Sequence, residues 1–262
     1  MVRRRGAGGG AALTLDKLGV PKDREGRERY VREMFDSISH RYDLLNRLLS
    51  FGQDVLWRKA AAALACGDGV GHVLDVATGT GDLALEVARR LGPHGSVVGV
   101  DFALGMMKVG VAKIEREGMA ARVRMVGGNG LALPFADGAF DAATTAFAAR
   151  NVADLLGFFR ELRRVVRPGG RVVCLELSHP SPALWRWLYE LYFYHAVPRI
   201  GRLFIGRSGP YEYLPGSLTD FPDPDRLATV MAAAGLTRVQ YRLKLGGIAA
   251  IHVGEVPQAA DG

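Results

Sequence analysis

The chain has 262 residues, of which 48% are hydrophobic, so it is long enough to bury one substantial core. No apolar run approaches the roughly 18 residues that a membrane-spanning helix needs, and residues 1–14 hold no apolar stretch of signal-peptide length, so we expect a cytoplasmic protein. Cys66 and Cys174 are far apart and lack the spacing of a disulfide framework or a zinc site, so we expect two core thiols and no metal.

The formal net charge of +7 is concentrated at the N-terminus, because residues 1–35 contain nine arginine and lysine residues against five aspartate and glutamate residues. The rest of the chain is nearly balanced and lacks the basic face typical of nucleic-acid-binding proteins, so we expect no nucleic-acid partner. The basic N-terminal segment fits attraction to an anionic membrane surface and simple solubility equally well.

The chain begins with residues 1–22, a segment rich in glycine and arginine that we expect to be disordered. We expect residues 23–262 to form a single domain that starts with N-terminal helices over residues 23–66. Apolar residues recur there every three or four positions, which is typical of one face of an amphipathic helix: Tyr30, Met34, Ile38, Tyr42, Leu45 and Leu49. A further helix is predicted over Leu56–Leu64.

The centre of the chain alternates short β-branched runs with helical segments. The runs that predict strands are His72–Val76, Ser96–Val100, Arg122–Val126, Asp141–Thr145 and Arg171–Leu175. The segments that predict helices are Asp82–Leu91, Leu104–Glu117 and Asp154–Val166, the last of them closed by Pro168-Gly169-Gly170. This alternation predicts an α/β fold with a mostly parallel sheet and helices on both of its faces.

Residues 178–215 interrupt the alternation with an insert rich in aromatic residues and arginine. After the insert, the sequence predicts a helix at Pro224–Ala234 and strands at Arg238–Leu243 and Ile248–Val253. We expect these two strands to complete a seven-stranded sheet as an antiparallel edge.

Residues 73–82 (VLDVATGTGD) indicate a buried strand that runs into a glycine turn at the start of a helix. Gly79 and Gly81 permit backbone conformations that other residues disfavour, and they let a ligand approach closely. Asp101 ends the next strand, where a carboxylate can accept hydrogen bonds from a ribose diol. The pattern predicts a nucleotide-type cofactor, and taken alone it leaves NAD and S-adenosylmethionine equally open.

Later stretches favour S-adenosylmethionine. Gly128-Asn129-Gly130 ends the third predicted strand, where a polar side chain and a backbone amide can read the edge of an adenine ring. Residues 133–141 (LPFADGAFD) lead into the fourth strand, and residues 164–170 (RVVRPGG) precede the fifth. In this order the set resembles the class I S-adenosylmethionine-dependent methyltransferases, which have a Rossmann-like fold.

The resemblance implies which residues hold the cofactor. Thr80, Asp101, Asn129 and Gly130 match positions that contact it, and Gly79 and Gly81 match the turn itself. No metal is implied, because transfer of a sulfonium methyl group depends mainly on holding donor and nucleophile in line.

Residues 42–52 (YDLLNRLLSFG), followed by Trp57, are not general to methyltransferases. They resemble the first signature of the ubiquinone/menaquinone biosynthesis methyltransferases, and residues 164–178 (RVVRPGGRVVCLELS) resemble the second. With the Arg150-Asn151 pair, the resemblance extends over about residues 30–254. Three positions depart from the family's pattern, and none removes a group that the chemistry needs: Leu45, Asp54 and Ala146.

The resemblance implies transfer of a methyl group from S-adenosylmethionine to a ring carbon of a prenylated quinol. Residues 172–176 (VVCLE) and the insert look closer to the menaquinone relatives. We therefore favour demethylmenaquinol, a prenylated naphthoquinol, as the acceptor, which implies the final step of menaquinone biosynthesis. The alternatives are a ubiquinone-pathway or dual-specificity C-methyltransferase and, less favoured, an NAD-dependent oxidoreductase.

A quinol ring carbon becomes a competent nucleophile when its neighbouring hydroxyl ionises, so the site needs a group that stabilises the phenolate or removes its proton. Arg150 is the candidate stabiliser, since a guanidinium is a poor proton acceptor; a surface ion pair is the alternative role. His195 is the candidate base; an ordinary, partly buried histidine is the alternative. Tyr211, with Tyr213, is a candidate to orient the ring, although core packing explains both tyrosines as well.

A prenyl tail must be bound at or beside a bilayer, so the aromatic insert at 178–215 is a candidate interfacial lid, and we expect peripheral membrane contact. An additional packed helix pair would give the same residue pattern. The sequence does not predict the oligomeric state.

Overall fold

The computed structural model describes residues 15–21, 23–67, 69–178, 180 and 209–258, with the backbone alone at residues 17 and 209–212. A seven-stranded sheet forms its centre, in the order β3-β2-β1-β4-β5-β7-β6. The strands are β1 (His72–Val76), β2 (Ser96–Asp101), β3 (Val123–Gly127), β4 (Phe140–Ala146), β5 (Val166–Leu177), β6 (Thr237–Lys244) and β7 (Ala249–Glu255). The predicted α/β fold is confirmed.

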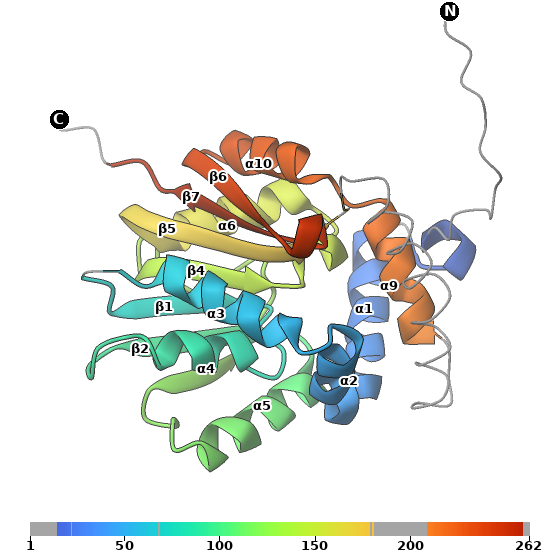
Figure 1. The fold of residues 1–262 in the computed structure, drawn as a ribbon, viewed down its shortest axis with the longest axis horizontal. Coiled ribbons are helices and arrows are strands. Elements are labelled where there is room, and N and C mark those ends of the chain that lie inside the picture. The colour runs from blue at the N-terminus through green and yellow to red at the C-terminus, as the bar shows by residue number, and fades with distance from the viewer. Residues whose placement is uncertain (1–14, 22, 68, 179, 181–208, 259–262) are drawn as a thin grey trace, which may run out of the picture.

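Helices cover both faces of the sheet and one end of it (Figure 1). The α-helices are α1 (Arg24–Ile38), α2 (Tyr42–Leu49), α3 (Gln53–Ala65), α4 (Asp82–Ala88), α5 (Leu104–Arg116), α6 (Leu155–Val165), α9 (Gly209–Thr219) and α10 (Pro224–Ala233). Short 3-10 helices are η1 (Leu15–Leu18), η2 (Ser39–Arg41), η3 (Ala149–Asn151) and η5 (Leu245–Gly247). Among the helices of the described residues, none is long and apolar enough to cross a bilayer.

Alternating side chains of the strands enter two separate cores. On β1, Val73 packs in a cluster with α3 and α4, and the next residue, Leu74, packs in a cluster with α6 and α10. Burial on both faces explains why the central strands β1 and β4 are mainly apolar, whereas the edge strand β6 (TRVQYRLK) is mostly exposed and carries polar residues.

The strand directions differ from the prediction at one edge. Strands β1 to β5 pair in parallel, and β7 pairs antiparallel with both β5 and β6. The antiparallel strand β7 is therefore interior, and β6 at the edge runs parallel to the other strands. The expected antiparallel edge was wrong for β6, because chain order alone does not say which of two consecutive strands joins the sheet first.

A second difference lies between α6 and β5. The predicted loop Pro168-Gly169-Gly170 does not close the helix, because α6 ends at Val165 and β5 begins at Val166. The pairing of β4 with β5 shifts register at this point, from Phe140 opposite Val166 to Ala142 opposite Arg171. The Pro-Gly-Gly residues thus form an irregularity inside the strand, where Gly169 takes a φ of +77°.

A third cluster lies at the N-terminal end of the chain and joins η1 to α1 and α9. Leu15 and Val20 are buried there, against Val31 and Met34 of α1 and Tyr213 of α9. The segment expected to be disordered, residues 1–22, was therefore drawn too long at its C-terminal end, since residues 15–20 contribute apolar side chains to this cluster. Residues 1–14 and residues 181–208 of the insert lie outside the described part of the chain.

Candidate active site

A cavity that opens to solvent lies where the carboxyl ends of β1, β2, β3 and β4 meet α1. This is the crevice at which open α/β sheets bind ligands. Residues of the glycine turn, of the ends of β2 and β3 and of the first signature line it, together with residues of α1 and η3: Glu28, Tyr42, Gly79, Asp101, Asn129, Gly130 and Asn151.

The glycine turn after β1 forms one wall of the cavity. Gly79 and Gly81 have φ values of +58° and +78°, in the left-handed region that side chains disfavour, and Gly81 caps the start of α4. Gly79 lines the cavity, whereas Gly81 does not. The prediction of a glycine turn at the start of a helix is confirmed.

Asp101 lies opposite the glycine turn and is 6% exposed. Its Oδ2 accepts a hydrogen bond from the Gly79 N–H at 2.7 Å, and its Oδ1 accepts one from the Ala103 N–H at 2.8 Å. Burial raises the pKa of this carboxyl, and the backbone hydrogen bonds oppose that rise. A carboxylate oxygen accepts more than one hydrogen bond, so Asp101 keeps acceptor capacity for a diol placed in the cavity.

Asn129 and Gly130 also line the cavity, at the loop after β3. The Asn129 Oδ1 accepts a hydrogen bond from the Leu131 N–H at 2.9 Å, and its Nδ2 donates to the Glu28 Oε2 at 3.0 Å. A Cβ at Gly130 would lie 2.7 Å from the Phe158 ring, so only glycine fits there. Sequence reasoning missed Glu28, because a carboxylate on an amphipathic helix is usually a solvated surface charge.

Thr80 is not among the cavity-lining residues. It is 2% exposed, and its hydroxyl donates to the Asp43 Oδ1 at 2.6 Å and accepts from the Lys113 Nζ at 3.1 Å. Lys113 also pairs with Asp82 at 2.6 Å. The structure therefore does not bring the Thr80 side chain to the cofactor position. It uses that side chain to fasten the glycine turn to α2 and α5.

Arg150 is buried in η3, which follows β4 at the carboxyl edge of the sheet. Its Nη1 donates to the Phe147 carbonyl at 2.8 Å and pairs with the Glu176 carboxylate, which is 1% exposed. Arg150 is thus ion-paired, as in the alternative role, but the pair is buried and does not lie at the surface. Arg150 does not line the cavity, whereas its neighbour Asn151 does.

Tyr42 brings the first family signature to the same cavity. Burial raises the pKa of its hydroxyl, and the guanidinium groups of Arg58 and Arg150 act in the opposite direction. Asp54, which departs from the family's usual histidine, is 2% exposed and pairs with Arg58 at 2.5 Å. That guanidinium lies 5.1 Å from the centre of the Phe147 ring, and Phe147 lines the cavity.

The remaining predicted residues are placed as follows. His195 lies outside the described residues, and Tyr211 belongs to α9 without a described side chain. Tyr213 is 2% exposed, with its ring 5.9 Å from that of Tyr30. Burial raises the pKa of its hydroxyl, although Arg27 and Arg150 lie near enough to act against that rise.

Solved structures share the fold. A SAM-dependent methyltransferase from Aquifex aeolicus superposes with a TM-score of 0.55 at 18% identity, over 76% of this chain and 89% of that one. Another from Thermotoga maritima gives a TM-score of 0.59 at 17% identity, over 85% of this chain and 98% of that one. At these identities the likeness shows the fold alone.

Sequence relatives are much closer. A demethylmenaquinone methyltransferase of Thermus thermophilus is 49% identical over 224 residues, which are 86% of this chain and 100% of the relative. Its counterpart in Deinococcus radiodurans is 46% identical over 243 residues, 93% of this chain and 99% of the relative. A ubiquinone/menaquinone biosynthesis C-methyltransferase of Geobacter sulfurreducens is 44% identical over 225 residues, 86% of this chain and 88% of the relative. The model of one family matches residues 23–256, so the chain belongs to the ubiE/COQ5 methyltransferase family.

Proposed function

We propose that this methyltransferase moves the methyl group of S-adenosylmethionine to a ring carbon of a prenylated quinol, with demethylmenaquinol as its preferred acceptor. One observation carries the proposal: a single cavity is lined both by the cofactor motifs, at Gly79, Asp101 and Asn129, and by the first family signature and the Arg-Asn pair, at Tyr42 and Asn151. The names of the relatives support the acceptor class. Membership of a methyltransferase family argues against the NAD-dependent alternative.

The residues around the cavity fit the cofactor. Asp101 offers acceptors for a ribose diol, and the left-handed Gly79 lets the chain pass close to a ligand without a Cβ in the way. When bound, S-adenosylmethionine supplies an electrophilic methyl group. The chain's own task is then to hold donor and acceptor in line and to exclude water.

On the acceptor side, the protein must favour the ionised quinol. Arg150 and Arg58 bring two guanidinium charges close enough to act on the Tyr42 hydroxyl, which lines the cavity. These two charges act to lower the pKa of a quinol hydroxyl placed beside Tyr42, against the burial that raises the pKa of Tyr42 itself. After methyl transfer the ring carbon releases its proton and the aromatic quinol is restored. We assign proton removal to His195 or to water and ring orientation to Tyr211, as proposals.

Arg150 is best tested together with its buried partner. Replacement of Arg150 alone leaves Glu176 buried without its cation, which lowers the free energy of unfolding by about 3–5 kcal/mol. With Arg150→Met alone, a loss of turnover could therefore come from unfolding as well as from catalysis. We expect Arg150→Met with Glu176→Gln to fold, to lose about 10² in turnover, and to bind S-adenosylhomocysteine within about threefold of the wild type. Higher pH should partly restore its turnover, because more of the free quinol is then ionised.

The exposed Arg160→Met, on α6, is the matched control for that double variant. The comparison needs turnover and S-adenosylhomocysteine affinity measured side by side. Normal turnover in the double variant would contradict a role for Arg150 at the acceptor. Loss of cofactor affinity with a proportional loss of turnover would contradict it too.

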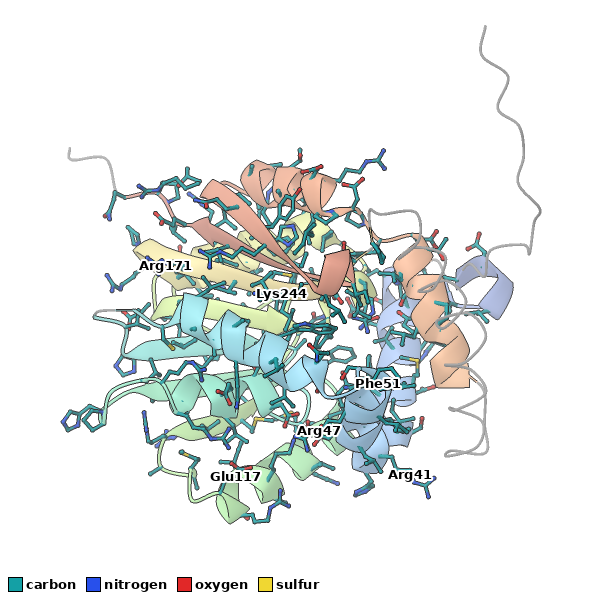
Figure 2. All side chains as sticks on the ribbon, in the orientation of Figure 1. Arg41, Arg47, Phe51, Glu117, Arg171 and Lys244 are labelled. Atoms are coloured by element: carbon teal, nitrogen blue, oxygen red, sulfur yellow. The ribbon has the colours of Figure 1, made fainter. Side chains whose placement is uncertain are left out.

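We further propose peripheral contact with an anionic membrane, which would give access to a prenylated acceptor. Large apolar side chains of α2 and the start of α3 are exposed, with Leu44 61%, Leu48 42% and Leu56 55% accessible. The exposed charged side chains of residues 41–63 are all basic, and Arg41 and Arg47 lie around α2 beside Phe51 (Figure 2). An apolar ridge with a cationic rim is typical of surfaces that lie in a membrane interface.

The function is tested with the purified full chain, S-adenosylmethionine, and demethylmenaquinol beside the benzoquinol of matching tail, with products followed by mass. We expect the naphthoquinol to be methylated faster. Equal rates for the two quinols would support a dual-specificity enzyme. Faster methylation of the benzoquinol would support the ubiquinone pathway. If neither quinol is methylated, the proposal is overturned. Thermal stabilisation by S-adenosylhomocysteine but not by NADH is the expected companion result.

A further inference from the structure

Three residues of α1 line the cavity from above the carboxyl ends of the strands: Glu28, Val31 and Phe35. Their spacing of three and four places them on one face of the helix. The middle of this helix thus forms a wall of the cavity, although the cofactor motifs all lie on the sheet side. Glu28 is the acidic residue of this wall.

The Glu28 carboxylate is held by one donor on each oxygen. Its Oε1 accepts from the Arg24 Nε at 3.0 Å, and its Oε2 accepts from the Asn129 Nδ2 at 3.0 Å. Its side chain is 30% exposed. The contact with Asn129 joins α1 to the loop after β3, and the two residues lie about a hundred positions apart in the sequence.

Asn129 presents the donor end of its amide to Glu28. Its Oδ1 already accepts from the backbone N–H of Leu131 at 2.9 Å, and that contact fixes which end of the amide is oxygen. The other end, Nδ2, is a donor and faces Glu28. Of these two side chains, the carboxylate is the stronger acceptor, because it is charged and has two oxygens that can each accept more than one hydrogen bond, whereas the amide has one neutral oxygen.

This inference rests on the proposed cofactor. With the ribose diol at Asp101, at the end of β2, the base extends toward the loop after β3, the next strand in the sheet, where Asn129 and Gly130 lie. Adenine presents an exocyclic amino group, which is a pure donor, whereas hypoxanthine presents a carbonyl oxygen at the same place. A carboxylate accepts hydrogen bonds and cannot donate while ionised, so it favours the first and repels the second.

We propose that Glu28 accepts a hydrogen bond from the adenine amino group of the cofactor and sets the specificity of the site for adenine over hypoxanthine. The helix α1 then acts as part of the nucleoside site as well as a cover for it. A contact that merely fastens α1 to the loop would not distinguish the two bases.

The test is calorimetric binding of S-adenosylhomocysteine and of S-inosylhomocysteine to the full chain and to Glu28→Gln. Glutamine keeps an oxygen for Asn129 and adds an NH₂ group that can donate to a carbonyl. We expect the wild type to prefer the adenosyl compound by about tenfold or more, as for loss of one hydrogen bond to a charged group. In Glu28→Gln the two affinities should come within about threefold of each other.

Glu25→Gln is the matched control, because Glu25 is exposed in the first turn of the same helix. It should keep the preference of the wild type. An unchanged preference in Glu28→Gln, or a wild type that binds both compounds equally, would overturn the role of Glu28 and leave the proposed function standing. If the wild type binds neither compound, the proposed cofactor itself is wrong. Thermal unfolding of each variant shows that it is folded before binding is compared.

Discussion

Asp101 combines two tasks in one carboxylate, since it accepts two backbone N–H groups and faces the cavity. Asparagine has one acceptor oxygen, so its NH₂ group would oppose either the Gly79 or the Ala103 amide. We expect Asp101→Asn to weaken S-adenosylhomocysteine binding by about 1–3 kcal/mol and to lower the free energy of unfolding by a similar amount. Calorimetry and urea unfolding check the two effects, with the exposed Asp137→Asn as control. Unchanged affinity would exclude Asp101 from the ribose site.

Asp75 is a buried carboxyl on β1 with a separate consequence for pH. Its two oxygens accept hydroxyl hydrogen bonds from Thr78 and Thr144, each at 2.6 Å, and burial raises its pKa from 3.8 to about 6. Between these two values the folded chain keeps a proton that the unfolded chain has released. The free energy of unfolding contributed by Asp75 therefore falls as pH rises through this window, by about 3 kcal/mol at most, and stays low above it.

The variant Asp75→Asn should lack that fall, because an amide does not titrate and the threonine hydroxyls can turn to accept from it. Asp82 and Asp141 have lowered pKa values and act in the opposite direction, so the informative quantity is the difference between the two stability profiles. Urea unfolding from pH 4 to pH 8 measures it. We expect the variant to gain on the wild type as pH rises. Parallel profiles would mean that Asp75 keeps an ordinary pKa.

At the same scale, the sequence predicts the site residues that belong to a local motif. Gly79, Asp101 and Asn129 follow strands at recognisable positions, and the structure places all three around one cavity. Glu28 could not be predicted, because its contact with Asn129 depends on how α1 packs over the sheet. The contacts of the Thr80 hydroxyl could not be predicted for the same reason, because its partners Asp43 and Lys113 come from distant helices, and its contact with the cofactor stays a prediction.

Among the elements, α2, α4 and α5 are joined by a largely buried network around Lys113, which is 7% exposed. Its ammonium contacts Asp43 of α2, Asp82 of α4 and Thr80 of the glycine turn. Burial acts to raise the pKa of Asp82, yet the pKa is lowered, because Lys113 and Arg58 lie close to the carboxylate. Lys113 thus joins α2 to the cofactor turn and to the start of α4.

Removal of that cation should be costly. Lys113→Met leaves two carboxylates close together, and we expect the free energy of unfolding to fall by about 2–3 kcal/mol. This is below the cost for fully buried pairs, because the Asp43 and Asp82 side chains keep 20% and 14% exposure. Urea unfolding measures the loss. Lys108→Met, an exposed lysine on the same helix, should change stability by less than about 0.5 kcal/mol. Equal effects of the two substitutions would show that the network adds no stability.

Element positions were predictable wherever a local pattern decides them. The strand β1 has the predicted bounds, and β2 extends the predicted one by a single residue at Asp101. The junction of α6 with β5 and the direction of β6 were not predictable, because both depend on which neighbouring strand accepts the hydrogen bonds. Local sequence carries propensity and burial, whereas strand order is a property of the assembled sheet.

For the molecule as a whole, the membrane proposal predicts co-sedimentation with anionic vesicles that weakens with salt, since screening acts on exposed charges. Deletion of residues 2–14 should weaken binding, because it removes Arg3, Arg4 and Arg5; Leu15 is kept because it is buried. The double variant Leu44→Gln with Leu48→Gln should weaken vesicle binding further at high salt, where burial of apolar side chains contributes most of the binding. Leu243→Gln, 46% exposed on β6, is the matched control. No sedimentation of the wild type at low salt would end the membrane proposal.

The interior place of β7 sets the order in which the sheet can be completed during synthesis. The strand lies between β5 and β6, yet residues 249–255 leave the ribosome after both of its neighbours. Until then one edge of β5 is open and β6 has no partner in the sheet. Open strand edges are sites of aggregation, so a chain stalled or truncated before Ala249 would carry two of them at once. Native assembly of the sheet therefore waits for β7, and chaperone demand should be greatest while the edges of β5 and β6 are both open.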